Sequence, residues 1–187
     1  MQHSVLNPEQ KQYLLTVARK AIQRSVSGLS NCDFLPEHDV LSLPGASFVT
    51  LTVSGRLRGC IGSLEAQQPL FMDVWHNAQR AAQNDPRFPL VLESELDQIK
   101  IEISVLGELQ PIDVSSEEEL LTRIRPDIDG LLIDDGVHRA TFLPSVWQQL
   151  PDPTTFLAHL KVKAGLAQSG WPEGIRCAVY QVEKWSE

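Results

Sequence analysis

The sequence has only three cysteines among its 187 residues, at positions 32, 60 and 177. An odd number of widely spaced cysteines does not make a disulfide framework and is typical of a reducing compartment. Metal-binding spacings such as C-x-x-C or H-E-x-x-H are missing, and so are phosphate loops and dinucleotide-binding glycine patterns. We therefore expect a cytoplasmic protein with no metal and no cofactor.

Long apolar runs and an excess of basic residues are also absent. No apolar stretch approaches the ~20 residues that span a bilayer, and the first eight residues lack the regions of a signal peptide. The chain has 16 Lys and Arg against 24 Asp and Glu, a formal charge of −8. Because nucleic acids bind basic surfaces, we expect neither a nucleic-acid nor a membrane partner.

What remains is an ordinary globular composition, with 42% hydrophobic and 21% charged residues. The length fits one domain over residues 1–187, with a possible small subdomain within it. A chain of this size buries roughly 70% of the surface that its unfolded form exposes. This is enough for the chain to fold without cross-links.

Four segments have the periodicity and the end signals of helices. Asn7 is placed to cap the first, Pro8 suits the first helical position, and Gln10 completes a capping-box pattern. The predicted helices run from Pro8 until Gly28 stops the first, from Pro69 to Gln83, from Ser116 to Ile124, and from Pro153 to about Ala164.

The strand signals are joined mostly by hairpin-type connections. The predicted strands are Ser47–Val53, Leu57–Gly62, Gln98–Gly107, Leu131–Ile133, Val137–Phe142 and Ile175–Trp185. Connections of this kind favour an α+β fold in which helices flank an antiparallel sheet.

The first hairpin has two possible registers. A two-residue loop would set Cys60 opposite Val49 and mix charged with apolar side chains. A loop of three or five residues would set Cys60 opposite Thr50 and Arg58 opposite Thr52, which separates an apolar face from a polar one. We therefore expect the odd-length loop.

The segment Arg56-Leu57-Arg58-Gly59-Cys60-Ile61-Gly62 is the most informative in the chain. Strand alternation places Arg56, Arg58 and Cys60 on one face, where the guanidinium groups would favour the thiolate form of the cysteine. The alternative is that Cys60 is packed structurally between small residues, and spacing alone favours this alternative. The two cations are the main argument against burial.

Two further residues are candidates for the same site. Glu102 lies on the polar side of its strand and would approach Cys60 if both strands belong to one sheet, although such a residue is more often part of a solvated face. Arg87 lies in the rigid turn Asp85-Pro86-Arg87-Phe88-Pro89, which otherwise serves only to end a helix and anchor Phe88. We treat Arg56, Arg58, Arg87 and Glu102 as candidate substrate-binding residues around Cys60.

Leu57-Arg58-Gly59-Cys60-Ile61-Gly62 resembles the signature of the AMMECR domain family. Four more segments agree with the family in order: Asp85–Pro89, Ile101–Leu106, Ala140–Pro144 and Lys163–Leu166. Trp171 and the closing strand fit as well, so the resemblance covers nearly the whole chain. Leu90 departs from the pattern, since a second proline is expected after Pro89.

The resemblance implies an α+β fold with an antiparallel sheet, helices around it, and a smaller subdomain forming a cleft lined by Cys60. It also implies an association with a Memo-type protein and a radical S-adenosylmethionine enzyme, as in the AmmeMemoRadiSam system. The chain lacks the C-x-x-x-C-x-x-C ligands of a radical enzyme's cluster, so it would be the partner of that enzyme.

Two functions from different classes follow. The chain is either an enzyme or enzyme subunit that uses the Cys60 thiolate on a small polar or anionic molecule, or a non-catalytic adaptor that binds a protein. An exposed, reactive thiol would favour the enzyme, in which case Cys60 would be alkylated faster than Cys32 and Cys177. A buried, unreactive thiol would favour the adaptor. The sequence shows no general base beside Cys60.

Overall fold

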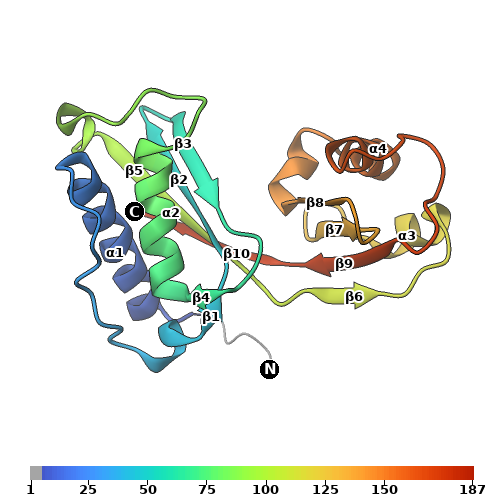
Figure 1. The fold of residues 1–187 in the computed structure, drawn as a ribbon, viewed down its shortest axis with the longest axis horizontal. Helices are drawn as coiled ribbons and strands as arrows, with labels where there is room; N and C mark the ends of the chain where they lie inside the picture. The colour runs from blue at the N-terminus through green and yellow to red at the C-terminus, as the bar shows by residue number, and fades with distance from the viewer. Residues whose placement is uncertain (1–5) are drawn as a thin grey trace. The chain divides into compact units, whose positions relative to one another are not determined.

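The structure is a computed structural model that describes residues 6–187. The chain forms two compact units (Figure 1). The first unit runs to Leu106 and also contains Glu183–Glu187, and the second unit is Gly107–Val182. None of the described helices has the length and apolarity needed to cross a membrane.

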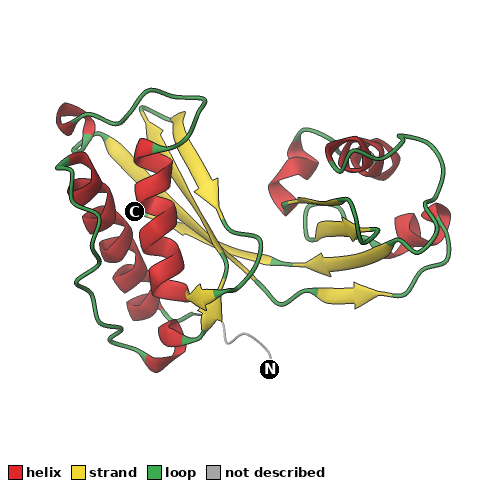
Figure 2. Cartoon of the chain, in the orientation of Figure 1, coloured by secondary structure: helices red, strands yellow, loops and turns green. Residues whose placement is uncertain are grey.

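The first unit is a four-stranded antiparallel sheet with two helices packed on it (Figure 2). The helices are α1 (Pro8–Val26) and α2 (Leu70–Gln83). The strands lie in the order β10-β5-β2-β3 and are β2 (Ser47–Val53), β3 (Arg56–Gly62), β5 (Ile99–Leu106) and β10 (Val182–Ser186). The strands β1 (Pro44–Gly45) and β4 (Gln68–Pro69) form a separate short pair, and short 3-10 helices occur at η1 (Asp39–Ser42) and η2 (Glu93–Glu95).

The N-terminus of α1 has the capping box that the sequence predicts. The Gln10 amide N–H donates to the Asn7 side chain, and the Asn7 amide N–H donates to the Gln10 side chain, both at 2.9 Å. These bonds satisfy two of the backbone donors that a helix start leaves without partners. The apolar face of α1 then packs on α2, and both helices contact the sheet.

The hairpin between β2 and β3 has the predicted pairing of Cys60 with Thr50, but not the predicted loop. The loop contains two residues, Ser54 and Gly55, which both have positive φ (51° and 74°), as a tight hairpin turn of this length requires. A β-bulge then inserts Arg58, so that Leu57 pairs with Thr52 and Gly59 with Leu51. The extra residue shifts the register by one position, as the expected odd-length loop would have done.

The second unit is a four-stranded antiparallel sheet in the order β6-β9-β7-β8, with α3, α4 and the 3-10 helix η3. The strands are β6 (Gln110–Ile112), β7 (Gly130–Asp134), β8 (Arg139–Phe142) and β9 (Arg176–Tyr180). The helices are α3 (Glu117–Arg123), η3 (Pro144–Gln148) and α4 (Pro153–Lys163). Its core includes Trp147 and Phe156, whose rings stack 3.7 Å apart.

The fold is α+β with antiparallel sheets, as predicted. The prediction of one closing strand over Ile175–Trp185 is wrong, because this segment forms β9 in the second unit and β10 in the first. Periodicity alone could not show the change of sheet, because the two strands follow each other with only Gln181 between them and both have strand-type sequence. The short strand β6 was not expected either, because Pro111 at its centre weakens the strand signal.

Gly59 allows β3 to lie directly against the last turn of α2. A Cβ atom at this position would lie 2.1 Å from the Ala81 carbonyl oxygen, which is backbone and cannot rotate away. Ile61, two residues along the same strand, packs against the same apolar core. The predicted packing of Gly59 on the apolar face is therefore confirmed.

We expect the substitution Gly59→Val to lower the free energy of unfolding by about 2 kcal/mol or more, because it overpacks this contact. Urea denaturation followed by circular dichroism measures the loss. Gly62→Val is the comparison on the same strand, where the added atoms would meet the Phe48 ring at its Cγ atom, so that a change in the Phe48 χ1 angle instead of a backbone shift would relieve the clash. An equal or larger loss for Gly62→Val would contradict the assigned role of the helix backbone.

Candidate functional site

Cys60 lies on β3, at the edge of the first unit's sheet, and its side chain is half-buried. The Thr50 hydroxyl, directly opposite on β2, donates a hydrogen bond to Cys60 Sγ over 3.3 Å. Thr50 in turn pairs with Glu102 on β5, so the three side chains form a row across one face of the sheet. The structure thus brings Glu102 near Cys60, with Thr50 between them.

The backbone of Cys60 is bound by the turn that follows α2. The Cys60 amide N–H donates to the Asp85 carboxylate at 2.8 Å, and Arg87 Nη2 donates to the Cys60 carbonyl oxygen at 3.1 Å. Asp85 and Arg87 also form an ion pair, with contacts of 2.7 and 2.9 Å. Two side chains therefore complete the hydrogen bonds that an edge strand would otherwise leave open.

Charge and hydrogen bonds strongly stabilise the ionised form of Asp85, which is only 5% exposed. The Arg87 guanidinium, followed by the amide N–H groups of Cys60 and Arg87, holds the pKa of Asp85 far below its ordinary value, although burial acts in the opposite direction. The same pair raises the pKa of Arg87. The carboxylate is thus part of the structural scaffold around Cys60.

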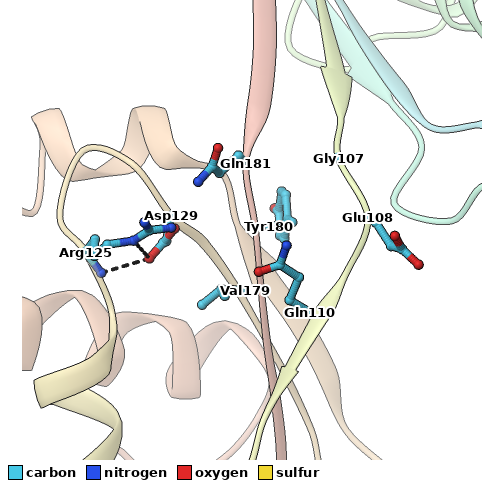
Figure 3. Close-up of a pocket in the computed structure, with 8 residues that line it drawn as sticks. All are labelled: Gly107, Glu108, Gln110, Arg125, Asp129, Val179, Tyr180 and Gln181. Carbon is cyan, nitrogen blue, oxygen red and sulfur yellow. Dashed lines mark hydrogen bonds and ion pairs between the residues drawn. The ribbon is translucent and has the colours of Figure 1, made fainter. Parts of the chain in front are cut away.

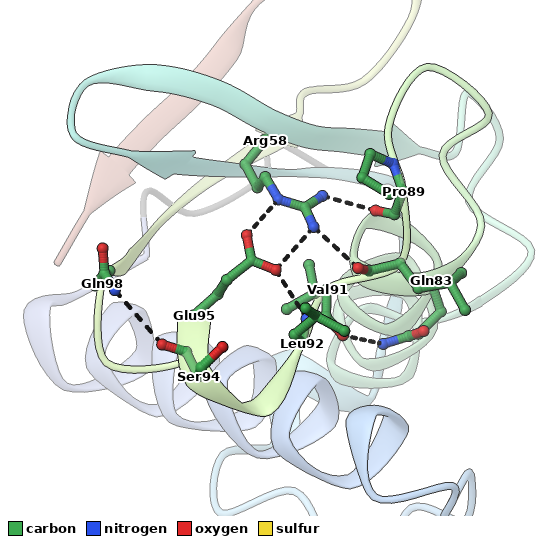
Figure 4. Close-up of polar contacts among 9 residues, drawn as sticks. Arg58, Gln83, Pro89, Val91, Leu92, Ser94, Glu95 and Gln98 are labelled. Atoms are coloured by element: carbon green, nitrogen blue, oxygen red, sulfur yellow. Dashed lines mark hydrogen bonds and ion pairs between the residues drawn. The ribbon is translucent and has the colours of Figure 1, made fainter.

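Arg58, the residue inserted by the bulge, binds the segment beyond that turn (Figure 4). Its guanidinium contacts both carboxylate oxygens of Glu95, at 2.7 and 3.0 Å, and lowers the pKa of Glu95. It also donates to the carbonyl oxygens of Pro89 and Leu90, at 2.8 and 3.0 Å. These bonds occupy Nε and both terminal nitrogens of the guanidinium.

The predicted grouping of Arg56, Arg58 and Cys60 on one strand face is wrong. Because the bulge adds Arg58 to β3, the residue paired with Thr52 is Leu57 and not Arg58. Leu57 therefore shares the face of Thr50 and Cys60. Arg56 lies exposed at the end of the hairpin, opposite Val53. The sequence pattern contained no signal for the bulge.

Of the other two candidate binding residues, Arg87 is bound to Asp85 and to the Cys60 carbonyl. Glu102 forms an ion pair with Lys184 at 3.3 Å. Arg87 therefore contacts the Cys60 backbone, whereas Glu102 is separated from Cys60 by Thr50, and each already has a partner of opposite charge. Within residues 6–187, no three His, Cys, Asp or Glu side chains gather as metal ligands.

A pocket of about 270 Å³ lies within the second unit (Figure 3). The residues that line it come from the start and end of this unit and from the loop after α3: Gly107, Glu108, Gln110, Arg125, Asp129, Val179, Tyr180 and Gln181. None of them was a candidate from the sequence. The only sequence signal for this pocket was the spacing of Arg125 and Asp129, which are four residues apart and can therefore form an ion pair.

The model of the AMMECR1 family matches residues 15–185 of this chain. The chain belongs to the AMMECR1 family. A family relative from Methanothermobacter thermautotrophicus is 38% identical over 170 residues, which cover 89% of this chain and 88% of the relative. Another from Saccharolobus islandicus is 36% identical over 176 residues, covering 89% and 76%.

A solved structure has the same fold as this AMMECR1-family chain. It is the crystal structure of the uncharacterized protein PH0010 from Pyrococcus horikoshii, with a TM-score of 0.86 and 30% sequence identity. The match covers 97% of this chain and 93% of that one. The descriptions of these three proteins name no activity or ligand, so the function must be argued from the residues.

The Asp85 carboxylate generates a prediction about pH. Because its pKa is lower in the folded chain than the ordinary 3.8 of the unfolded one, its contribution to stability is present above about pH 4 and decreases as the pH falls. Asp85→Asn removes a charged acceptor from a buried position and should cost about 1–3 kcal/mol at neutral pH. The difference in the free energy of unfolding between the variant and the wild type should decrease progressively below about pH 4.

Urea unfolding between about pH 3 and about pH 7 tests this prediction. Asp97→Asn, which changes an exposed carboxyl group of the same unit, is the control and should follow the wild type throughout. A difference for Asp85→Asn that stays constant across this range would show that the ionised carboxylate is not what stabilises the turn.

Proposed function

We propose that this AMMECR1-family protein is a non-catalytic protein-binding module of the cytoplasm, whose docking segment is residues 89–92. The observation that supports the proposal is the set of hydrogen bonds that the Arg58 guanidinium makes. All of its bonds go to Glu95 and to the carbonyl oxygens of Pro89 and Leu90, so the arginine of the signature holds a segment of backbone.

The docking segment is held at every residue. Besides the bonds from Arg58, the Val91 amide N–H donates to the carbonyl oxygen of Ala82 on α2 at 2.9 Å, and the Leu92 amide N–H donates to the Glu95 carboxylate at 2.8 Å. The Gln83 side chain binds the Val91 carbonyl oxygen at 3.2 Å. Several independent contacts therefore fix a segment that has no helix or strand of its own.

The same contacts leave two large apolar side chains in solvent. Val91 is buried in the core, whereas Leu90 is 59% and Leu92 is 62% exposed. Single exposed leucines are common on protein surfaces, but two on a segment that is fixed so heavily form a preorganised apolar contact. Because this segment is already ordered, little conformational entropy would be lost when a partner binds the two leucines.

The partners we propose are a Memo-type protein and a radical S-adenosylmethionine enzyme, which the family resemblance suggests. The rest of the signature then has structural roles. Gly59 packs on α2, while Asp85 and Arg87 complete the hydrogen bonds of Cys60. Arg58, which is bound through Nε and both terminal nitrogens, contributes less to a substrate site than the isolated cation expected from the sequence.

Replacing both leucines should weaken partner binding without unfolding the chain. We expect Leu90→Ser with Leu92→Ser to weaken binding of the purified Memo-type protein or radical enzyme by about tenfold or more, measured by biolayer interferometry. The matched control is Leu35→Ser with Leu43→Ser, two leucines of the first unit that are exposed to 83% and 55%. Cys60→Ser should bind like the wild type.

Two outcomes would contradict the docking segment. The first is that neither purified partner binds the wild-type chain. The second is that binding is unchanged by the leucine substitutions but lost in Cys60→Ser.

A thiol enzyme is the second candidate, because the Cys60 thiol is half-buried and not enclosed and accepts a hydrogen bond from the Thr50 hydroxyl. A partly exposed cysteine is the residue that a thiol enzyme would use as its nucleophile. The small polar or anionic substrate expected from the sequence would then bind beside Cys60, near Arg87 and Glu102.

Alkylation of the native protein separates the two candidates. We expect Cys177 to react slowest with iodoacetamide, because burial raises the pKa of its thiol to about 11. If the protein is a binding module, Cys60 should react at a rate within about tenfold of Cys32, which is also half-buried. Peptide mapping by mass spectrometry gives the three rates, and a much faster reaction of Cys60 would favour the enzyme.

A further inference from the structure

We infer that the pocket of the second unit is a binding site for a small molecule that carries one carboxylate and one amide group. The pocket lies wholly within Gly107–Val182, whereas the docking segment lies in the first unit. This inference therefore does not depend on the proposed protein-binding function. It follows from a fixed arginine, two amide side chains and the size of the pocket.

Arg125 is fixed before any ligand binds. Its Nε and Nη2 atoms donate to the two carboxylate oxygens of Asp129 at 2.9 and 2.7 Å, and its amide N–H donates to the same carboxylate at 3.0 Å. Asp129 is 2% exposed, and its carbonyl oxygen accepts a bond of 2.7 Å from the Trp147 ring. The arginine is thus held by a carboxylate that is itself anchored in the core.

The free end of this guanidinium is available to a ligand. Nη1 of Arg125 has no hydrogen-bond partner within residues 6–187, and the side chain is 54% exposed. The Asp129 contact also raises the pKa of Arg125, so the group stays charged. Nη1 and the remaining N–H of Nη2 form the planar fork that recognises a carboxylate.

The loop that carries Arg125 has a constrained backbone. Asp127 has a φ of 63°, in the left-handed region that a residue with a Cβ rarely adopts. The amide N–H groups of Ile128 and Asp129 both donate to the Arg125 carbonyl oxygen, at 3.2 and 3.0 Å. Strained positions of this kind persist where the surrounding structure imposes them, and they are concentrated at binding sites.

Two amide side chains line the pocket with the arginine. Gln110 at the start of β6 and Gln181 after β9 point toward the Arg125 side, whereas the Glu108 carboxylate points away from it (Figure 3). The described residues provide no hydrogen-bond partner for either glutamine side chain. Each amide offers one donor and one acceptor, which matches an amide group on a ligand.

Charge and size limit the ligand further. The Asp129 carboxylate already balances Arg125, so the site favours a single carboxylate over a dianion. The hydroxyl of Tyr180 is engaged by Thr141 and by the Phe142 carbonyl oxygen, and so does not add a polar group to the pocket. A volume of about 270 Å³ equals roughly nine water molecules, which suits a compact molecule.

N-acetylglycine has these features and is the probe we choose. In a titration to about 20 mM followed by ¹H–¹⁵N correlation spectra, we expect a dissociation constant of about 1 mM. The shifted amide signals should belong to residues 107–110, 125–129 and 179–181. N-acetylglycinamide, in which the carboxylate is replaced by a neutral amide, should bind at least about tenfold more weakly.

Three variants test which side chains are responsible. Arg125→Gln should reduce the affinity by at least about tenfold, and Gln181→Ala by about threefold or more. Arg123→Gln is the matched control, because it removes an arginine of α3 that is paired with Glu119 and does not line the pocket. It should bind N-acetylglycine like the wild type.

Gln181→Ala keeps the Arg125–Asp129 pair, so it remains informative if Arg125→Gln destabilises the loop.

Three results would overturn the inference. They are no shifted signals in the wild type at about 20 mM, shifts that lie outside these three segments, or an affinity that neither Arg125→Gln nor Gln181→Ala changes.

Discussion

The close contact between Gly59 and the backbone of α2 is the constraint on which the signature segment depends. Because no side chain separates them, β3 lies against the last turn of the helix, and the chain that leaves the helix passes along the strand edge. Asp85 and Arg87 then reach Cys60, while the bulge directs Arg58 toward Glu95 and the Pro89 carbonyl. The glycine and the charged residues form one structural unit, which the sequence motif alone does not show.

Local sequence signals predicted most of the elements but not how they connect. The periodicity of the helices and the capping box of Asn7 and Gln10 concern residues within a few positions of each other, and the structure has them. The hairpin register could be predicted from the separation of apolar and polar faces. The loop length could not, because a two-residue turn plus a bulge gives the same pairing of Cys60 with Thr50 as a longer loop.

The candidate site was harder to predict for a physical reason. The long side chain of an arginine can reach partners far away in the sequence, so strand alternation says little about where its charge lies. Arg58 pairs with Glu95, 37 residues later, and Glu102 approaches Lys184. The pocket around Arg125 depends in the same way on residues from three separate parts of the chain.

The division of the chain also has a consequence for its synthesis on the ribosome. The second unit is inserted between Leu106 and Glu183, and the Gly107 amide N–H donates to the Gln181 carbonyl oxygen at 2.8 Å. The final strand β10 and Glu187, which contacts Arg19 of α1, therefore join the first unit last. A ribosome adding about 5–20 residues per second releases these residues only after the whole insertion has been made. The first unit can therefore complete its sheet only after the whole of the inserted second unit has been synthesised.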